Sequence, residues 1–174
     1  MATARGPSRG DALQPALLDR LLVREGGATL HALSRAEVRS AILRDLAWLL
    51  NAVQALPAEQ AERHPAAAQS VLNFGLPPLA GELASQVDIR GLERAIGDTI
   101  ARFEPRIDPT TLEVRALPIT SRLDTHNVIE FEIRARVWAQ PVPTDVLLRT
   151  RLDLEAGKIE IAEPSGVVRQ GDDR

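Results

Sequence analysis

The sequence predicts an α+β domain of two layers, with N-terminal helices packed on one face of an antiparallel β-meander. Three observations support this prediction. Apolar residues recur at helical spacing in the first part of the chain, a Glu-Pro-Arg corner follows at residues 104–106, and apolar and polar residues then alternate as in strands. We expect one face of the sheet to pack on the helices and the other face to be exposed.

One domain is expected from the length of 174 residues, which suffices to bury about two-thirds of the unfolded surface. Residues 1–15 are rich in Gly, Ser, Pro and Arg and predict a disordered tail. Residues 16–162 form the predicted domain, and residues 163–174 a polar tail. Ala16–Val23 is a short amphipathic segment, either a docking segment or a strap that lies on the domain.

The first long helix is predicted to begin at Ser34, which forms a capping box with Glu37, and to run to about Ala55 before Pro57. Residues 58–68 are interpreted as a variable connector, part of which is a helical turn. The residues assigned to the apolar side of the helix are Val38, Ile42, Leu46, Leu49 and Val53, widened by Ala41, Trp48 and Leu50.

Ser70–Leu79 is predicted to be an ordered apolar loop. Gly75 can adopt a positive φ, and the Pro77–Pro78 pair excludes regular structure directly after it. We expect Phe74 and Leu76 to anchor the loop to the core. An apolar loop of this length has to be held against the domain or form an interface.

The central helix is predicted over Asp88–Phe103, with Asp88 as its N-cap. Pro105 disfavours helical geometry for Glu104, so the helix should end at about Phe103. Glu104-Pro105-Arg106 then forms the corner between the helical and the β half of the chain. The apolar side of the helix consists of Ile89, Leu92, Ile96, Ile100 and Phe103.

Four strands are predicted, over residues 111–118, 128–139, 144–154 and 159–162, with a glycine-containing turn at 155–158. Alternation in the two central strands assigns the side chains that should face the core. They are Ile129, Phe131, Ile133, Ala135 and Val137 in one strand and Val146, Leu148, Thr150, Leu152 and Leu154 in the other.

One register of the central hairpin brings opposite charges together across the strands: Glu130 with Arg151, Glu132 with Arg149, and Arg136 with Asp145. The turn at residues 140–143 leaves the need for a bulge open. Residues 111–118 and 159–162 are the candidate edge strands, to which another chain could add a strand. A proline at Glu113 or Glu160 is expected to remove an edge donor.

Composition argues against several kinds of partner and chemistry. The net charge is −3 with no basic cluster, which argues against nucleic-acid binding. No apolar run approaches about 18 residues, so neither membrane insertion nor a secretory leader is expected. The absence of cysteine excludes disulfides, thiolate nucleophiles and cysteine-ligated metals, and a cytoplasmic location is the natural inference.

Catalytic chemistry has little support in the sequence, and neither a metal nor a cofactor is expected. The histidines lie in three separate regions, at His31, His64 and His126. No phosphate-binding loop or nucleophile elbow is present. Glu104 and Asp108 could form a glycosidase pair. The preferred interpretation is structural, with Glu104 paired to Arg106 or Arg102 and Asp108 opening a turn.

Four motifs in order carry a resemblance to a known family: LLDRL, SVLNFGLP, RFEPRID, and a closing hairpin that reads VLLRTRLDLEAGKIEI. Together they resemble the TssE family, baseplate subunits of bacterial type VI secretion systems, within the phage baseplate wedge family historically named lysozyme-like. The resemblance covers residues 16–162, apart from the Ala-rich connector at residues 58–68.

The resemblance implies a non-catalytic structural component of the cytoplasmic baseplate. It implies the wedge proteins TssF and TssG and the sheath subunits as partners, and a role in templating the first sheath ring. Two alternatives are a peptidoglycan-cleaving enzyme and a regulatory, anti-adaptor-like module of the same fold. The implied site residues, which either contact a partner or lock the corner, are Glu104, Pro105 and Arg106 with Asn73, Gly75, Leu76 and Pro77.

Overall fold

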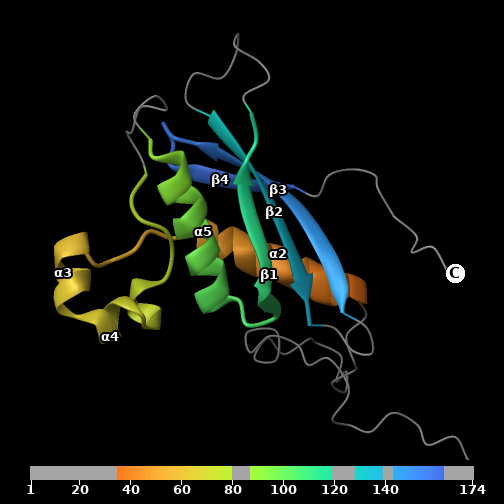
Figure 1. The fold of residues 1–174 in the computed structure, drawn as a ribbon, viewed down its shortest axis with the longest axis horizontal. Helices are drawn as coiled ribbons and strands as arrows, with labels where there is room; N and C mark the ends of the chain where they lie inside the picture. The colour runs from red at the N-terminus through yellow and green to blue at the C-terminus, as the bar shows by residue number, and fades with distance from the viewer. Residues whose placement is uncertain (1–34, 80–86, 119–127, 139–142, 163–174) are drawn as a thin grey trace, which may run out of the picture.

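The computed structural model describes residues 35–79, 87–118, 128–138 and 143–162, which fold into helices followed by a sheet (Figure 1). The predicted tails, Ala16–Val23, Ser34, His31 and His126 lie outside these residues. The elements in chain order are α2 (Arg35–Asn51), α3 (Ala58–Arg63), α4 (Pro65–Ala68), the 3₁₀ turn η1 (Val71–Asn73), α5 (Ile89–Phe103), β1 (Ile107–Ala116), β2 (Val128–Val137), β3 (Thr144–Asp153) and β4 (Lys158–Ala162).

The sheet has the order β1-β2-β3-β4 with every neighbouring pair antiparallel, which confirms the predicted α+β meander. In Figure 1, α2 passes behind the sheet and α5 runs along β1, while α3 and α4 project to one side. Residues of α2 and α5 share one core with the inner face of the sheet. All ten side chains predicted to face inward from the two central strands are buried.

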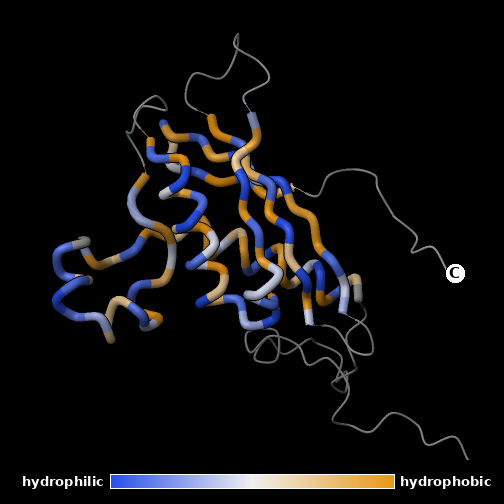
Figure 2. The backbone as a smooth tube through the Cα atoms, in the orientation of Figure 1, coloured by the Kyte–Doolittle hydropathy of each residue, from blue (hydrophilic) through white to orange (hydrophobic). Residues whose placement is uncertain are grey.

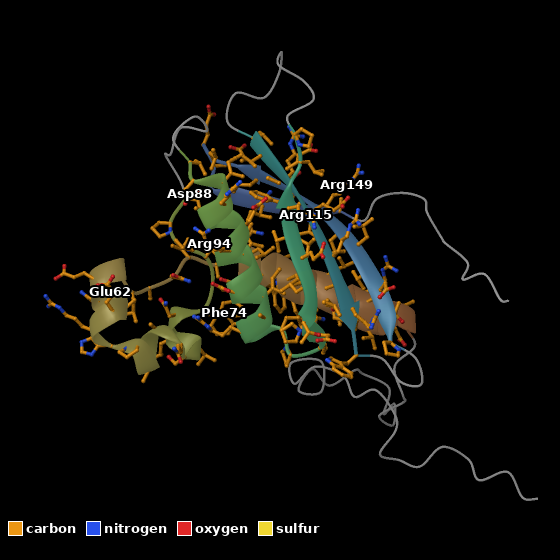
Figure 3. The ribbon with its side chains drawn as sticks, viewed as in Figure 1. Glu62, Phe74, Asp88, Arg94, Arg115 and Arg149 are labelled. Carbon is orange, nitrogen blue, oxygen red and sulfur yellow. The ribbon has the colours of Figure 1, made fainter. Side chains whose placement is uncertain are left out.

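The predicted register of the central hairpin is confirmed. Glu130 lies opposite Arg151, Glu132 opposite Arg149, and Arg136 opposite Asp145. Arg136 and Asp145 form an ion pair at 3.2 Å, whereas Glu132 pairs at 2.6 Å with Arg134 of its own strand. Hydropathy alternates along the strands in Figure 2, and Arg115 and Arg149 mark the charged outer face in Figure 3.

Helix α2 ends at Asn51, four residues earlier than predicted, because the main chain of the residues after it hydrogen-bonds to the loop. The N–H of Leu76 donates to the carbonyl of Ala52 at 2.9 Å, and the N–H of Gln54 donates to the carbonyl of Leu76 at 2.8 Å. These bonds join Val53 and Leu76 as a parallel bridge. A helix cannot continue through residues whose main chain is extended in this way.

Two residues assigned to the apolar side of this helix are exposed instead, and the assignment was wrong for both. Val53 lies beyond the end of the helix, and Trp48 lies on the side away from the core, where the Arg44 guanidinium stands 5.2 Å from its ring. The remaining predicted residues are buried, namely Val38, Ala41, Ile42, Leu46, Leu49 and Leu50.

Helix α5 matches its prediction closely, with Leu92, Ile96 and Ile100 buried. Asp88 precedes the helix, but its side chain makes no capping hydrogen bond and lies 3.8 Å from Arg94 instead. The connector at residues 58–68, for which no element was predicted beyond part of a helical turn, contains α3 and α4.

Strand β1 begins at Ile107, earlier than the predicted start at residue 111. Ile107 pairs with Val137, and the register then shifts between Asp108 and Glu113. Asp108 accepts hydrogen bonds from the N–H and hydroxyl of Thr110, at 2.9 and 2.7 Å, so the predicted turn lies within the strand as a bulge.

Candidate functional site

The corner after α5 is built around a buried carboxylate. Glu104 is 3% exposed, and its side chain lies against Arg106, two residues later. Arg106 Nε donates to Glu104 Oε1 at 2.6 Å, Arg106 Nη2 donates to Oε2, and the Arg106 N–H donates to Oε1 at 3.1 Å. The guanidinium and the carboxylate therefore meet as a bidentate pair.

Asp45 of α2 extends this pair into a network. Arg106 Nη2 donates to Asp45 Oδ2 at 2.6 Å, and Arg44 donates to Asp45 Oδ1 through Nε at 3.0 Å and Nη2 at 2.9 Å. Burial lowers the pKa of Arg106, but the Glu104 and Asp45 carboxylates outweigh burial and raise it. The network fastens the corner to α2.

Main-chain hydrogen bonds hold the same corner from inside. The Glu104 N–H donates to the Ile100 carbonyl at 2.9 Å, and the Ile107 N–H donates to the Glu104 carbonyl at 3.1 Å. The Trp138 N–H donates to the Arg106 carbonyl at 2.8 Å, which ties the end of β2 to the corner. Pro105 and Trp138 are exposed beside these fixed groups.

The loop after η1 is held by a buried amide. Asn73 Oδ1 accepts the Leu56 N–H at 3.1 Å, and Asn73 Nδ2 donates to the Ala68 carbonyl at 3.3 Å. Its side chain therefore joins the two ends of the connector that contains α3 and α4. A buried amide with these partners fixes a loop that has little regular structure of its own.

Gly75 is required at its position in this loop. Its φ is +116°, and a Cβ there would lie 2.2 Å from the Ala52 carbonyl oxygen. The Gly75 carbonyl accepts from Gln54 Nε2 at 3.0 Å and Thr99 Oγ1 at 3.4 Å. Leu76 is buried and Pro77 half-buried directly after it, so the predicted anchor to the core is present at Leu76.

The loop and the corner meet at the C-terminal end of α5. The rings of Phe74 and Phe103 lie edge to face with centroids 5.2 Å apart, and Figure 3 shows Phe74 beside this end of the helix. Phe103 directly precedes Glu104, and the neighbouring Arg102 donates to the Ala68 carbonyl at 3.2 Å. Contact between the two features runs through these residues rather than through the predicted site residues.

The sequence revealed neither Asp45 nor Arg44 as a member of the network. Asp45 lies between buried positions of α2, and its partner Arg106 is 61 residues away. The sequence signal that could have revealed it is a carboxylate directly beside Leu46, a fully buried residue. A carboxylate so close to the core needs a nearby partner.

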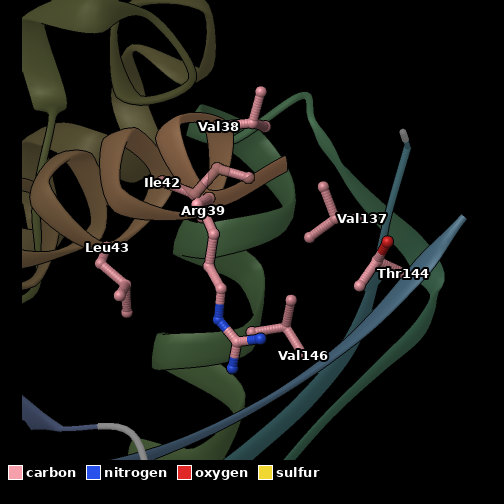
Figure 4. Close-up of a pocket in the computed structure, with 8 residues that line it drawn as sticks. Val38, Arg39, Ile42, Leu43, Val137, Thr144 and Val146 are labelled. Carbon is pink, nitrogen blue, oxygen red and sulfur yellow. The ribbon is translucent and has the colours of Figure 1, made fainter. Parts of the chain in front are cut away.

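An apolar groove lies between α2 and the ends of β2 and β3 (Figure 4). Its volume is about 310 Å³, and the charged side chain in its lining is that of Arg39. The lining residues are Ala36, Val38, Arg39, Ile42, Leu43, Val137, Thr144 and Val146. No carboxylate or histidine stands among these described lining residues.

The two carboxylates considered for glycoside hydrolysis are both in structural contacts. Glu104 is bonded to Arg106, and hydrogen bonds from Thr110 lower the pKa of Asp108. A general acid needs the opposite shift. Among the described residues there is also no cluster of three or more His, Asp or Glu side chains that could hold a metal ion.

In the part of the chain that the structure describes, no helix is both long and apolar enough to cross a membrane.

Comparison with known proteins identifies the family. No curated protein and no solved structure shows significant similarity to the chain. The family model described as baseplate wedge protein gp25 matches residues 36–142, more than half of the chain, and spans the loop, the corner, β1 and β2. The chain therefore belongs to the gp25 family of baseplate wedge proteins.

Proposed function

We propose that this chain is the subunit that joins the wedge of a cytoplasmic type VI secretion baseplate to the contractile sheath and templates the first sheath ring. Membership of the baseplate wedge family supports a structural role in a baseplate. The secretion system, the sheath contact and the cytoplasmic location are what the resemblance to the TssE family implies. In this proposal the protein acts by holding other proteins and catalyses no reaction.

The observation that carries the proposal is the position of the exposed apolar side chains. Val71 and Leu72 are 77% and 73% exposed, and Phe74 is at the border of exposure in the same loop. Trp138 is exposed beside the corner. Exposed apolar and aromatic side chains on a rigid frame are typical of protein interfaces, where Trp is enriched among the residues that dominate binding.

The predicted site residues divide into two roles in this interface. Glu104 and Arg106 fix the corner, so that Pro105 and Trp138 are presented in one position. Asn73, Gly75, Leu76 and Pro77 fix the loop that presents Val71 and Leu72. Preorganised contacts of this kind lower the conformational entropy lost on binding. We assign TssF and TssG to this surface.

The sheath contact is assigned to an edge of the sheet. The strand order leaves β1 and β4 as the two edges, because β2 and β3 are paired on both sides. In the proposal, a strand of a sheath subunit adds to one edge through main-chain hydrogen bonds, which tolerate many side chains. The outer face of the sheet is charged and is expected to remain in solvent.

The wedge contact is tested by a pull-down of TssF and TssG with the full chain. A Val71→Ser, Leu72→Ser variant is expected to lose capture at an unchanged melting temperature, because both side chains are exposed. Arg149→Ser, on the charged outer face, is the control and should capture normally. Full capture by the double variant would contradict the proposed interface.

The non-catalytic role is tested with peptidoglycan. Neither the wild-type chain nor a Glu104→Gln variant is expected to clear it, because the Glu104 carboxylate is buried against Arg106. Clearing by the wild type that the variant lacks would establish a lysozyme-like activity and overturn this part of the proposal.

A further inference from the structure

The groove beside α2 is an apolar cavity between two layers of the fold. Val38 and Ile42 of α2 form one side, and Val137 and Val146, at the ends of β2 and β3, form the other (Figure 4). Leu43, partly buried against the core, completes the α2 side. An apolar cavity of about 150 Å³ holds a benzene-sized group, so the groove, at about 310 Å³, has room for about two apolar side chains.

The segment Ala16–Val23, which lies outside the described residues, carries apolar side chains that suit such a groove. Its leucines are Leu17, Leu18, Leu21 and Leu22. At about 100° per residue, these four side chains fall within about 140° of a helix, and Asp19 and Arg20 fall on the other side. An amphipathic helix that lays its apolar face into a groove is a common mode of peptide recognition. Eight residues are too few for a stable helix in water, so we expect the helix to form on docking.

The length of the connection allows this segment to reach the groove. Residues 24–34 join it to Arg35, the first residue of α2. A chain of eleven residues spans at most about 40 Å, and a flexible one about 20 Å on average. Ala36 lines the groove directly after Arg35, and Leu43 lies about 12 Å further along the helix. The whole length of the groove is therefore within reach.

Attachment to the same chain favours this occupant over a separate molecule. A short connection keeps the segment near the groove at an effective concentration of order millimolar. A segment that binds weakly as a free peptide therefore still occupies the groove when it is attached. A second copy of the chain, or another protein, would need a much tighter contact to take its place.

We propose that Ala16–Val23 folds into a two-turn helix in this groove, with its leucines packed between α2 and the ends of β2 and β3. Of the two roles that the sequence leaves open for the segment, this assigns it the strap on the domain. The groove is then closed to apolar segments of other proteins. The inference concerns the chain by itself and does not depend on the proposed baseplate role.

Disulfide trapping tests the docking, and the full chain suits this method because it contains no cysteine. Thr144 lines the groove, whereas Asp145, the next residue, is exposed on the other face of the sheet. Leu21→Cys is combined with Thr144→Cys in one protein and with Asp145→Cys in the matched control. A disulfide needs Cα atoms about 4.4–6.8 Å apart, so docking brings only the first pair within bonding distance.

Oxidation at low protein concentration is expected to close the Thr144→Cys pair roughly tenfold or more faster than the Asp145→Cys pair. Equal rates for the two pairs, with Leu18→Cys as well as with Leu21→Cys, would overturn the inference and leave the groove to a separate protein. Disulfides between two chains in place of the internal one would assign the groove to a second copy, and would overturn it as well.

Alkylation of the single thiol introduced by Thr144→Cys supplies a second measurement that needs no disulfide. A docked segment shields this thiol, so adding Leu17→Ser and Leu21→Ser should raise its alkylation rate several-fold. The same two serines should leave the rate unchanged for the thiol introduced by Asp145→Cys. An unchanged rate at position 144 would contradict the docking. An equal rise at position 145 would indicate a general loosening of the domain and would contradict it too.

Discussion

The corner and the loop stand side by side at the end of α5, yet they are stabilised by different groups. Charged side chains hold the corner, with Arg106 between Glu104 and Asp45. Main-chain groups and one amide hold the loop, through Gly75 and Asn73. The corner therefore depends on opposite charges, and the loop depends on backbone conformation and packing. Substitutions in the two regions should therefore differ in how far they lower the free energy of unfolding and in how strongly salt changes that loss.

The largest effect is expected in the loop, from Gly75→Ala. The new Cβ would stand 2.2 Å from the Ala52 carbonyl oxygen at a φ of +116°, so the main chain has to move and the Leu76–Ala52 hydrogen bond is lost. We expect the free energy of unfolding to fall by about 4 kcal/mol or more, measured by urea denaturation.

Gly97→Ala in α5 is the matched control. The nearest atom to its new Cβ is Val114 Cγ2 at 3.8 Å, an ordinary contact. Alanine in a helix is favoured over glycine by about 0.5–1 kcal/mol, so this variant should be as stable as the wild type or slightly more stable. A Gly75→Ala protein as stable as the Gly97→Ala protein would show that the loop is not held by its backbone.

The corner should show the next largest effect, from Arg106→Ala. The variant leaves the Glu104 carboxylate buried without its partner, and breaking a buried pair from one side costs about 3–5 kcal/mol. Urea denaturation measures the loss. Combining Arg106→Ala with Glu104→Gln should recover part of it, because the buried charge is then absent. A double variant less stable than Arg106→Ala would contradict this explanation.

Asn73→Ala is expected to have a smaller effect. It leaves the part-buried Leu56 N–H without its acceptor, whereas the Ala68 carbonyl keeps its hydrogen bond from Arg102, and an unsatisfied buried group costs about 1–3 kcal/mol. Gln54→Ala is the control, because the Gly75 carbonyl keeps its hydrogen bond from Thr99. The melting temperature should fall clearly for Asn73→Ala and little for Gln54→Ala; equal shifts would show that the Asn73 amide contributes no more than a surface contact.

Local patterns predicted most of the sheet and the pair at the corner. Alternation in β2 and β3 identified all ten buried side chains, and opposite charges identified the register. Glu104 was predicted to pair with Arg106 or Arg102, and it pairs with Arg106. The start of β1 was not predicted, since the Asp108–Thr110 turn signal lies inside the strand as a bulge.

What the sequence did not reveal depends on residues far apart in the chain. The end of α2 is set by Leu76, which hydrogen-bonds to the Ala52 carbonyl and the Gln54 N–H, two groups that a longer helix would need for its own hydrogen bonds. Asp45 reaches Arg106 across 61 residues, and Asn51 reaches Ile159 across 108. No periodicity marks such contacts, because each involves main-chain groups or a single polar side chain at an element boundary or beside the core.

The smallest effect is expected from Asp45→Asn, and it tests how the corner shares its charges. Asp45 and Arg106 have side chains 24% and 26% exposed, so water and salt screen their attraction, and Arg106 keeps Glu104 in the variant. We expect a loss of about 0–1 kcal/mol in urea denaturation, which disappears at high salt. The loss in Arg106→Ala should persist at high salt, because Glu104 is buried. If Asp45→Asn lowered the free energy of unfolding as much as Arg106→Ala does, the Arg106–Asp45 contact with α2 would be what holds the corner. The Glu104–Arg106 pair would then be insufficient by itself.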